Sequence, residues 1–305
     1  MDRYLSLSSY FRDRFGGRVQ KIPLDAGFTC PNRDGTLSRL GCVFCNPKGS
    51  GSGLGKEGLS LAAQWEYWQE RFSPKHKAGR FIAYLQSFSN THGPVEKLAR
   101  TLDEIAPLPG LAGLAVGTRP DCLDGEKLAL LAAFPSDEIW LELGLQSAAD
   151  PTLERINRGH NSEAFAQTCR MASQAKLKIC AHIIAGLPGE TPAHFLHTID
   201  FLNDLPISGI KLHNLYVCRD TPLADDWKQG NYRPLERDEY LYSWLIPALK
   251  LLRPDIVIQR LTGDPGPSPG ELLAPPWCLD KAVFLNELHA VLKAEDVRQG
   301  SEWKG

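Results

Sequence analysis

The chain has 305 residues, 43% of them apolar, and a formal net charge of −2. This composition excludes an intrinsically disordered chain and a uniformly basic nucleic-acid-binding protein. The length fits either two average domains or one α/β barrel.

No apolar run approaches the roughly 20 residues of a membrane span. The N-terminal sequence MDRYLSLSSYFRDRFGG also lacks the apolar centre of a signal peptide. We therefore expect a cytoplasmic protein with no membrane partner. In a reducing compartment, clustered cysteines indicate metal binding or catalysis more often than disulfides.

Two stretches are locally basic. Residues 1–21 carry five Lys and Arg against two Asp, and residues 71–80 carry four Lys and Arg with no acidic residue. Either stretch could contact phosphate groups, and a solvated surface is the alternative interpretation.

Strand and helix patterns alternate along the chain. Apolar runs predict buried strands at residues 19–25, 80–86, 113–119, 138–146, 176–186 and 209–217. Helical spacing separates them at 59–72, 95–105, 125–134, 162–175 and 192–205. Asp150 and Thr191, each followed by proline, are the expected N-caps of two helices. The alternation predicts a parallel sheet covered on both faces, as an open doubly wound sheet or a partial barrel.

The pattern changes after residue 220. Residues 236–252 predict a helix interrupted near Pro247, and residues 255–261 predict a short strand. A Pro/Gly-rich loop and a final helix follow, at 263–277 and 279–295.

We therefore expect three regions. They are a basic N-terminal segment (1–17), a core (18–225) and a C-terminal α/β extension (226–305).

Three of the eight cysteines lie in CPNRDGTLSRLGCVFCN, residues 30–46, directly after the first predicted strand. Parallel α/β folds place their sites at this end of the strands. A structural zinc ion needs four ligands, so a fourth would come from elsewhere, such as Cys122 or His213. A disulfide between Cys42 and Cys45 is another alternative. Three thiolates also suit a 4Fe–4S cluster with one iron left open for a substrate or cofactor.

The trio Cys30, Cys42 and Cys45, ending in CVFC, resembles the radical S-adenosylmethionine (radical SAM) superfamily. In that family the open iron binds S-adenosylmethionine, which is cleaved reductively to a 5′-deoxyadenosyl radical. The usual spacing is C-x3-C-x2-C. The spacing here, C-x11-C-x2-C, resembles a narrower branch related to the catalytic subunit of Elongator and its bacterial stand-alone relatives.

Further stretches resemble that branch in the same order along residues 18–225. They are GTRPDCL (117–123), LELGLQSAADPTLERINRGH (141–160), HIIAGLPGET (182–191) and GIKLHNLYVCRDTPL (209–223). The resemblance implies a partial (β/α)6 TIM-like barrel. The resemblance does not extend to the acetyltransferase-like domain of the Elongator subunit, so we do not expect acetyl-CoA chemistry.

The resemblance also implies roles for individual residues. The three cysteines would be the catalytic cluster ligands, and Phe44 would screen the cluster from water, with ordinary core packing as its alternative. Glu142 and Gln146 are expected to contact the cofactor. They are four residues apart, so on a regular strand they share a face. The other expected cofactor contacts are Gln86 and Ser87 for the aminoacyl part, and Gly186, Leu215 and Val217 for the adenine.

Each of these roles has a structural alternative. Glu142 could instead form a buried ion pair with a basic residue such as Arg155 or Arg158, and Leu215 and Val217 could be plain core. Arg119, Lys211 and Arg260 are expected to meet a phosphate or carboxylate of the substrate, or else to form structural salt bridges.

The function implied by the resemblance is modification of RNA by a radical SAM enzyme, at a tRNA uridine in the wobble position. The partners would be S-adenosylmethionine, tRNA and an electron donor such as flavodoxin or ferredoxin. A radical SAM enzyme acting on a small metabolite or a protein is the alternative. An alternative of another class is a non-catalytic iron–sulfur or zinc protein.

Overall fold

The structure is a computed structural model that describes all residues except 1, 47–48, 50–53, 56, 77–78 and 266–269. Its strands are β1 Val19–Leu24, β2 Arg80–Leu85, β3 Leu111–Thr118, β4 Ile139–Gln146, β5 Lys178–Ala185, β6 Gly209–Asn214, β7 Val217–Cys218, β8 Val257–Arg260 and β9 Leu272–Ala274. Its helices are α1 Leu7–Phe15, α2 Leu61–His76, α3 Val95–Ile105, α4 Gly125–Ala132, α5 Asp150–Arg155, α6 Ser162–Gln174, α7 Pro192–Asn203, α8 Pro222–Lys228, α9 Ile246–Leu251 and α10 Lys281–Ala294. Short helical turns complete the list, η1 Pro120–Cys122, η2 Glu239–Leu245 and η3 Pro276–Leu279.

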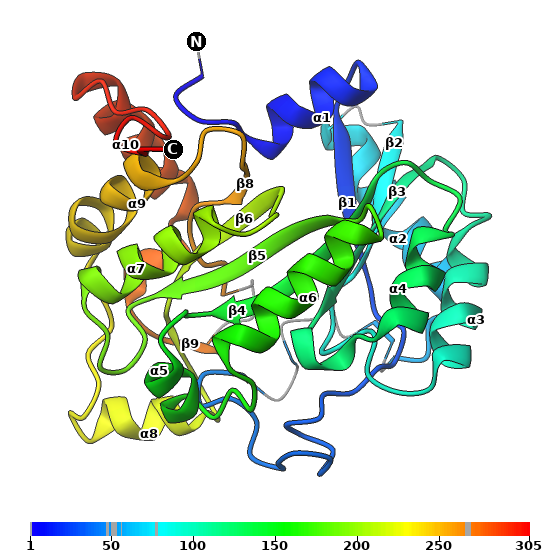
Figure 1. Ribbon diagram of the computed structural model, residues 1–305, viewed down its shortest axis with the longest axis horizontal. Coiled ribbons are helices and arrows are strands. Elements are labelled where there is room, and N and C mark those ends of the chain that lie inside the picture. The colour runs from blue at the N-terminus through cyan, green and yellow to red at the C-terminus, as the bar shows by residue number, and fades with distance from the viewer. Residues whose placement is uncertain (1, 47–48, 50–53, 56, 77–78, 266–269) are drawn as a thin grey trace.

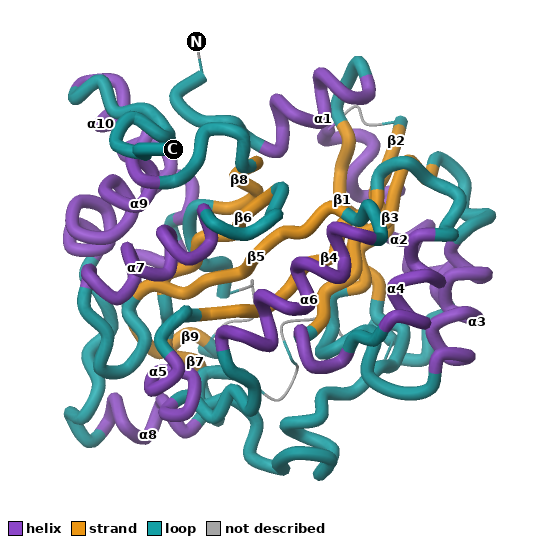
Figure 2. The backbone as a smooth tube through the Cα atoms, viewed as in Figure 1, coloured by secondary structure: helices purple, strands orange, loops and turns teal. Residues whose placement is uncertain are grey.

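The main sheet has the strand order β1-β2-β3-β4-β5-β6-β8, and every pair in it is parallel. A doubly wound sheet would reverse its strand order at a switch point. No reversal occurs here, so successive right-handed crossovers place their helices on one side and the sheet curls into a half-barrel (Figures 1 and 2). The predicted partial barrel is confirmed, and the doubly wound alternative is wrong.

The outer face of the sheet carries the main core. In β2, Phe81, Ala83 and Leu85 pack in the cluster formed with the surrounding helices, while Ile82 and Tyr84 belong to a separate inner cluster. This alternation follows from the two-residue period of a strand. The apolar strand runs in the sequence therefore reflect helices on the outside and a second, smaller core inside.

Helix α1 provides the floor of the barrel interior. Strand–helix alternation in the sequence did not predict this helix, which begins after the N-cap Ser6 and ends at Gly16 with φ 69°. Its Phe11 packs against Ile82 and Trp140 on the inner face at the amino-terminal end of the strands. The basic N-terminal segment thus closes the end of the barrel opposite the cysteine loop (Figure 1).

The C-terminal region completes the sheet. The predicted short strand is present as β8, beside β6. The helix expected to be interrupted near Pro247 instead changes from π-helical turns in η2 to α9, because proline lacks the amide hydrogen needed to continue the first pattern. The N-cap of α5 is Ala149 rather than Asp150, whereas Thr191 caps α7 as predicted.

Among the helices that the structure describes, none is both long enough and apolar enough to cross a bilayer.

Replacing Phe11 by alanine should lower the free energy of unfolding by about 3–5 kcal/mol, because it removes a buried aromatic ring from the barrel floor. Urea unfolding followed by circular dichroism would measure the loss. Met171→Ala, at an exposed position of α6, is the control and should change stability by less than about 0.5 kcal/mol. An equally small effect of Phe11→Ala would show that α1 does not seal the barrel.

Candidate functional site

The cysteine loop follows β1 at the carboxyl edge of the sheet. The amide of Gly41 donates to the carbonyl of Asn32 at 2.7 Å. The segment between these two residues therefore begins and ends at nearly the same place. The carbonyl of Cys30 accepts from two amides of the turn that follows it. The long gap between Cys30 and Cys42 is therefore a closed side loop, and it brings these two cysteines back together.

The turn after α5 holds the cysteine loop in place. Asn32 donates through Nδ2 to the carbonyls of Asn157 (2.6 Å) and Arg158 (3.1 Å). In return, Asn157 donates through Nδ2 to the carbonyl of Gly41 at 2.6 Å. The two asparagines thus clamp both ends of the side loop to the same turn.

Polar donors lie beside the sulfur of Cys42. Arg158 Nη1 lies 3.6 Å and Asn32 Nδ2 lies 3.7 Å from the sulfur of Cys42. Burial raises the pKa of Cys45, Arg33 lowers it, and the charges of Cys42 and Cys30 raise it again. All three thiols are free, and the closure of the side loop returns Cys42 to the part of the edge where Cys30 lies.

This donor set fits an anionic iron–sulfur cluster. Each thiolate of such a cluster binds its own iron, so the three sulfurs need not converge on one point. Among the described residues, no three His, Cys, Asp or Glu side chains are grouped to hold a single metal ion. The zinc alternative, with Cys122 or His213 as a fourth ligand, therefore finds no such group in the described chain. The disulfide alternative is wrong, because Cys42 and Cys45 are both free.

The turn after β2 packs against the cysteine loop. The amide of Ser89 donates to the carbonyl of Thr29 at 3.1 Å, and His92 Nε2 lies 2.7 Å from Asp34 Oδ2. The predicted aminoacyl contacts, Gln86 and Ser87, stand at the start of this turn. Their place beside the loop is compatible with that role, which stays a prediction.

Arg119, at the end of β3, also reaches the cysteines. Its guanidinium forms a bidentate pair with Asp121, at 2.9 and 2.8 Å. Burial alone would raise the pKa of Asp121, and the bonds from Arg119 outweigh it, so this pKa is lowered. Arg119 Nη1 is buried and has no hydrogen-bond partner among the described residues. Burial lowers the pKa of this side chain, and Asp121 together with the charges of Cys30 and Cys42 raises it.

An apolar cluster covers the other side of the edge. Phe44 packs against a buried group that includes the predicted adenine contacts Leu215 and Val217. The neighbouring Gly186 has φ 81°, and a Cβ atom there would meet Leu235 at 2.8 Å. Glycine is needed at this position because both the backbone conformation and the close contact exclude a side chain.

Glu142 lies inside the barrel rather than at its edge. It accepts from Lys21 and Lys211 and lies 2.9 Å from His182 Nε2, and Lys211 also donates to the hydroxyl of Tyr84 at 3.1 Å. Burial would raise the pKa of Glu142, and the two lysines bring it well below its ordinary value. We call the polar residues on the inner face the barrel-interior cluster, namely Lys21, Tyr84, Glu142, His182, Lys211, His213, Gln259 and Arg260.

The alternative of a buried ion pair for Glu142 is confirmed, but its basic partners are Lys21 and Lys211 and not Arg155 or Arg158. Arg155 donates to the carbonyl of Pro188, and Arg158 faces Cys42 and Gly144. A cofactor contact of Glu142 itself stays a prediction.

Gln146 reaches the inner face through a β-bulge. The pairing of β4 with β5 shifts between Gly144 and Gln146, and Gln146 has φ 79°. A Cβ atom on Gly144 would meet Gln146 Nε2 at 2.6 Å and Arg158 Nη2 at 2.5 Å. The amide of Gln146 therefore lies over Gly144, on the face that Glu142 occupies, although strand alternation is broken.

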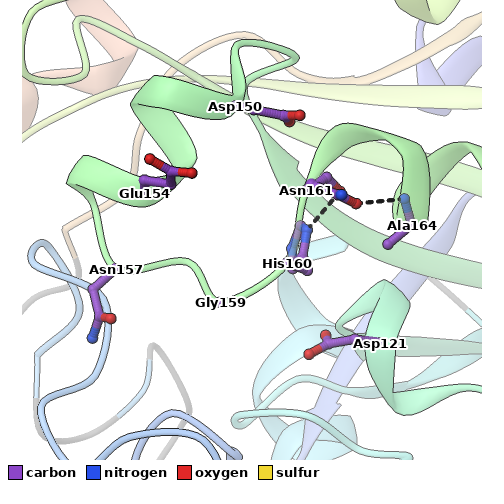
Figure 3. Close-up of a pocket in the computed structure, with 8 residues that line it drawn as sticks. All are labelled: Asp121, Asp150, Glu154, Asn157, Gly159, His160, Asn161 and Ala164. Carbon is purple, nitrogen blue, oxygen red and sulfur yellow. Dashed lines mark hydrogen bonds between the residues drawn. The ribbon is translucent and has the colours of Figure 1, made fainter.

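A surface pocket of about 690 Å³ adjoins the cysteine loop. Figure 3 shows Asp121 on one side of the pocket and Asp150 and Glu154 on the other, with His160 and Asn161 between Asp121 and Asp150. Burial and Arg158 lower the pKa of His160 to about 3, so its imidazole is neutral at pH 7. The sequence analysis did not predict this pocket, because its lining combines Asp121 of η1 with a separate segment that runs from α5 to the start of α6.

The structure gathers the predicted residues into two places. The cysteines lie at the carboxyl edge with Phe44, Ser87, Arg119, Gln146 and Leu215, whereas Glu142, Lys211 and Arg260 lie in the barrel interior. The sequence analysis missed Lys21, His182 and Gln259. The available signal was a polar residue within each otherwise apolar strand.

The comparisons with known proteins agree with this architecture. The family model described as the Radical SAM superfamily matches residues 35–202, and the one described as the Radical_SAM C-terminal domain matches residues 207–294. The protein YtqA of Bacillus subtilis (strain 168) is 35% identical over 300 residues, which are 98% of this chain and 92% of that protein.

Two more distant relatives connect the chain with Elongator. The tRNA uridine(34) acetyltransferase of Dehalococcoides mccartyi is 29% identical over 170 residues, which are 54% of this chain but only 36% of that protein. The solved structure of Methanocaldococcus infernus Elp3, with an N-terminal deletion, superposes with a TM-score of 0.72 at 16% identity. The superposed part is 92% of this chain and 64% of the Elp3 chain. This likeness supports the assignment of the fold.

The barrel-interior cluster should make the protein sensitive to acid. Burial and Lys211 lower the pKa of His182 to about 4, from 6.5. Between these values the unfolded chain binds a proton that the folded chain does not, so stability present above pH 6.5 is lost as the pH falls. From pH 7.5 to pH 5 we expect a loss of about 2 kcal/mol from this group in urea unfolding.

His182→Gln should reduce that pH dependence, whereas His197→Gln, at an exposed position of α7, should keep it. The same slope in both variants would contradict the assignment to His182.

Proposed function

The chain belongs to the radical SAM superfamily, and from this premise we propose that Cys30, Cys42 and Cys45 hold a 4Fe–4S cluster. The family implies both this cluster and S-adenosylmethionine. When bound, the cluster supplies the electron that cleaves S-adenosylmethionine to methionine and a 5′-deoxyadenosyl radical. Since the family consists of enzymes, the alternative of a non-catalytic iron–sulfur or zinc protein is set aside.

One observation carries the proposal. Three free cysteines are brought together by a side loop whose two ends are clamped to the turn after α5. Arg158 Nη1 and Asn32 Nδ2 lie 3.6 and 3.7 Å from the sulfur of Cys42, where they would donate to a cluster-bound thiolate. This arrangement supports the three cysteines as metal ligands at the edge where the strands end.

The neighbouring residues are proposed to shape the cofactor site. Phe44 and its apolar cluster would exclude water from one side of the cysteines, with Leu215 and Val217 against the adenine. Gln86, Ser87 and Gln146 would bind the polar parts of the cofactor. Arg119 Nη1, which has no partner in the described part of the chain, would hold a carboxylate or phosphate beside Cys30 and Cys42.

For the substrate we propose RNA, at a tRNA uridine in the wobble position, with flavodoxin or ferredoxin as the electron donor. The support is the likeness of half of this chain to a tRNA uridine(34) acetyltransferase. The two basic stretches do not add to it. Helix α1 and the end of α2 lie at the amino edge of the barrel, opposite the cysteine loop (Figure 1). Contacts to RNA should instead come from the exposed Arg39 on the side loop.

Anaerobic reconstitution with iron and sulfide, followed by reduction and addition of S-adenosylmethionine, should give 5′-deoxyadenosine with the wild-type protein. Cys42→Ala should lose this product and bind less iron, because one cluster ligand is missing. Cys169→Ala, in the outer core, is the matched control and should keep both. Wild-type protein that binds tightly held zinc and forms no product would overturn the cluster assignment.

The RNA proposal predicts a position-dependent effect on tRNA binding. Arg39→Gln should weaken binding and reduce the slope of log K against log salt concentration by about 1, because one phosphate contact is lost. Arg12→Gln, on α1 at the opposite edge, should leave the slope unchanged. The reverse result would place RNA at the amino edge, and no salt-dependent binding by the wild type would favour the small-molecule alternative.

A further inference from the structure

The barrel-interior cluster carries more positive than negative charge. Lys21, Lys211 and Arg260 face a single carboxylate, Glu142, which accepts from both lysines. Burial keeps the neighbouring His182 and His213 neutral at pH 7, since it lowers the pKa of His182 to about 4 and that of His213 well below its usual value. Two positive charges are therefore left without a counter-charge inside the barrel.

A β-bulge in β8 aims the unpaired donors inward. The pairing of β6 with β8 passes from Ile210 opposite Ile258 to Lys211 opposite Arg260, so Gln259 is the extra residue. Gln259 Oε1 accepts from Lys21 Nζ at 2.6 Å, which places this side chain on the inner face together with Lys211. Bulges of this kind turn side chains toward sites.

Both bulge residues still have unused donors. Gln259 Nε2 is buried and has no hydrogen-bond partner in the described chain. The structure shows no hydrogen bond or ion pair from the side chain of Arg260 to a described residue. A buried amide donor without a partner is costly unless something else satisfies it. The partly buried guanidinium of Arg260 has its donors available for an anion.

The cluster lies between two distinct layers. Phe11 and Trp140 form the apolar floor beneath it, and the cysteine loop lies beyond it at the carboxyl edge. His182, Gln259 and Arg260 are only partly buried, so water reaches this layer. A molecule bound here would have one end on the cluster and the other end directed toward the cysteines.

We propose that the barrel-interior cluster binds an anionic group of the substrate, a carboxylate or a phosphate. Arg260 donates through its planar fork and Gln259 through Nε2, while Glu142 holds Lys21 and Lys211 in position. The charged end of the substrate is anchored on the inner face and its reacting carbon points to the carboxyl edge. This inference deepens the proposed function and rests on it for the identity of the site as a substrate site.

Calorimetric titration of the cluster-loaded protein with sodium malonate and, separately, sodium phosphate at constant ionic strength tests the proposal. We expect saturable binding of one anion per chain. Arg260→Gln should weaken it by about tenfold or more, because a charged donor is lost. Arg260→Lys should recover part of the affinity, and Arg18→Gln, at the exposed amino edge, should bind as the wild type does.

The two titrations distinguish a carboxylate from a phosphate, and they distinguish the anion site from the proposed radical SAM activity. Binding of malonate alone supports a carboxylate, and binding of phosphate alone supports a phosphate ester. Binding of neither probe, or equal binding by wild type and Arg260→Gln, overturns the inference. Because the titration needs no turnover, a failure to cleave S-adenosylmethionine overturns the proposed function without deciding the anion site.

Discussion

Parallel strands laid down in chain order place all their crossover helices on one face of the sheet, and the rest of the structure depends on this constraint. The outer face is covered and apolar, as the cluster around Phe81, Leu85 and Leu141 shows. The inner face has no helices of that kind to cover it. It is closed at the amino end by Phe11 of α1 and stays polar toward the other end. The half-barrel is thus closed at the amino-terminal end of its strands. It is open at their carboxyl-terminal edge, which we call the rim.

The rim and the barrel interior carry different functional groups. At the rim, a closed side loop brings Cys42 back beside Cys30, and the turn after α5 holds it there through Asn32 and Asn157. In the interior, Glu142 binds two lysines and leaves Arg260 unmatched. The rim suits an iron–sulfur cluster with its cofactor, and the interior suits the charged end of a substrate.

The closed side loop also explains how an unusual spacing can serve an ordinary arrangement. The residues between Asn32 and Gly41 project outward and expose Leu37, Arg39 and Leu40. Adding residues to a loop whose two ends are already held together costs little conformational entropy, because the ends of the loop keep their positions. The extra length is therefore free to form a surface beside the site without changing the position of the cysteines.

The sequence by itself determined the strand–helix order, the short strand β8, the cysteine trio and, through ordered motifs, the family. These features are local, since they depend on periodicity and on spacing within single segments. Periodicity alone left both barrel and open sheet possible, and the family resemblance implied the barrel. The strand order, which is a property of pairing between strands, shows it. The tertiary structure decided the partners of Glu142, since Lys21 and Lys211 are distant in sequence and meet only when the sheet curls. The bulges that turn Gln146 and Gln259 inward escaped prediction for the same reason: register is set between strands and not within them.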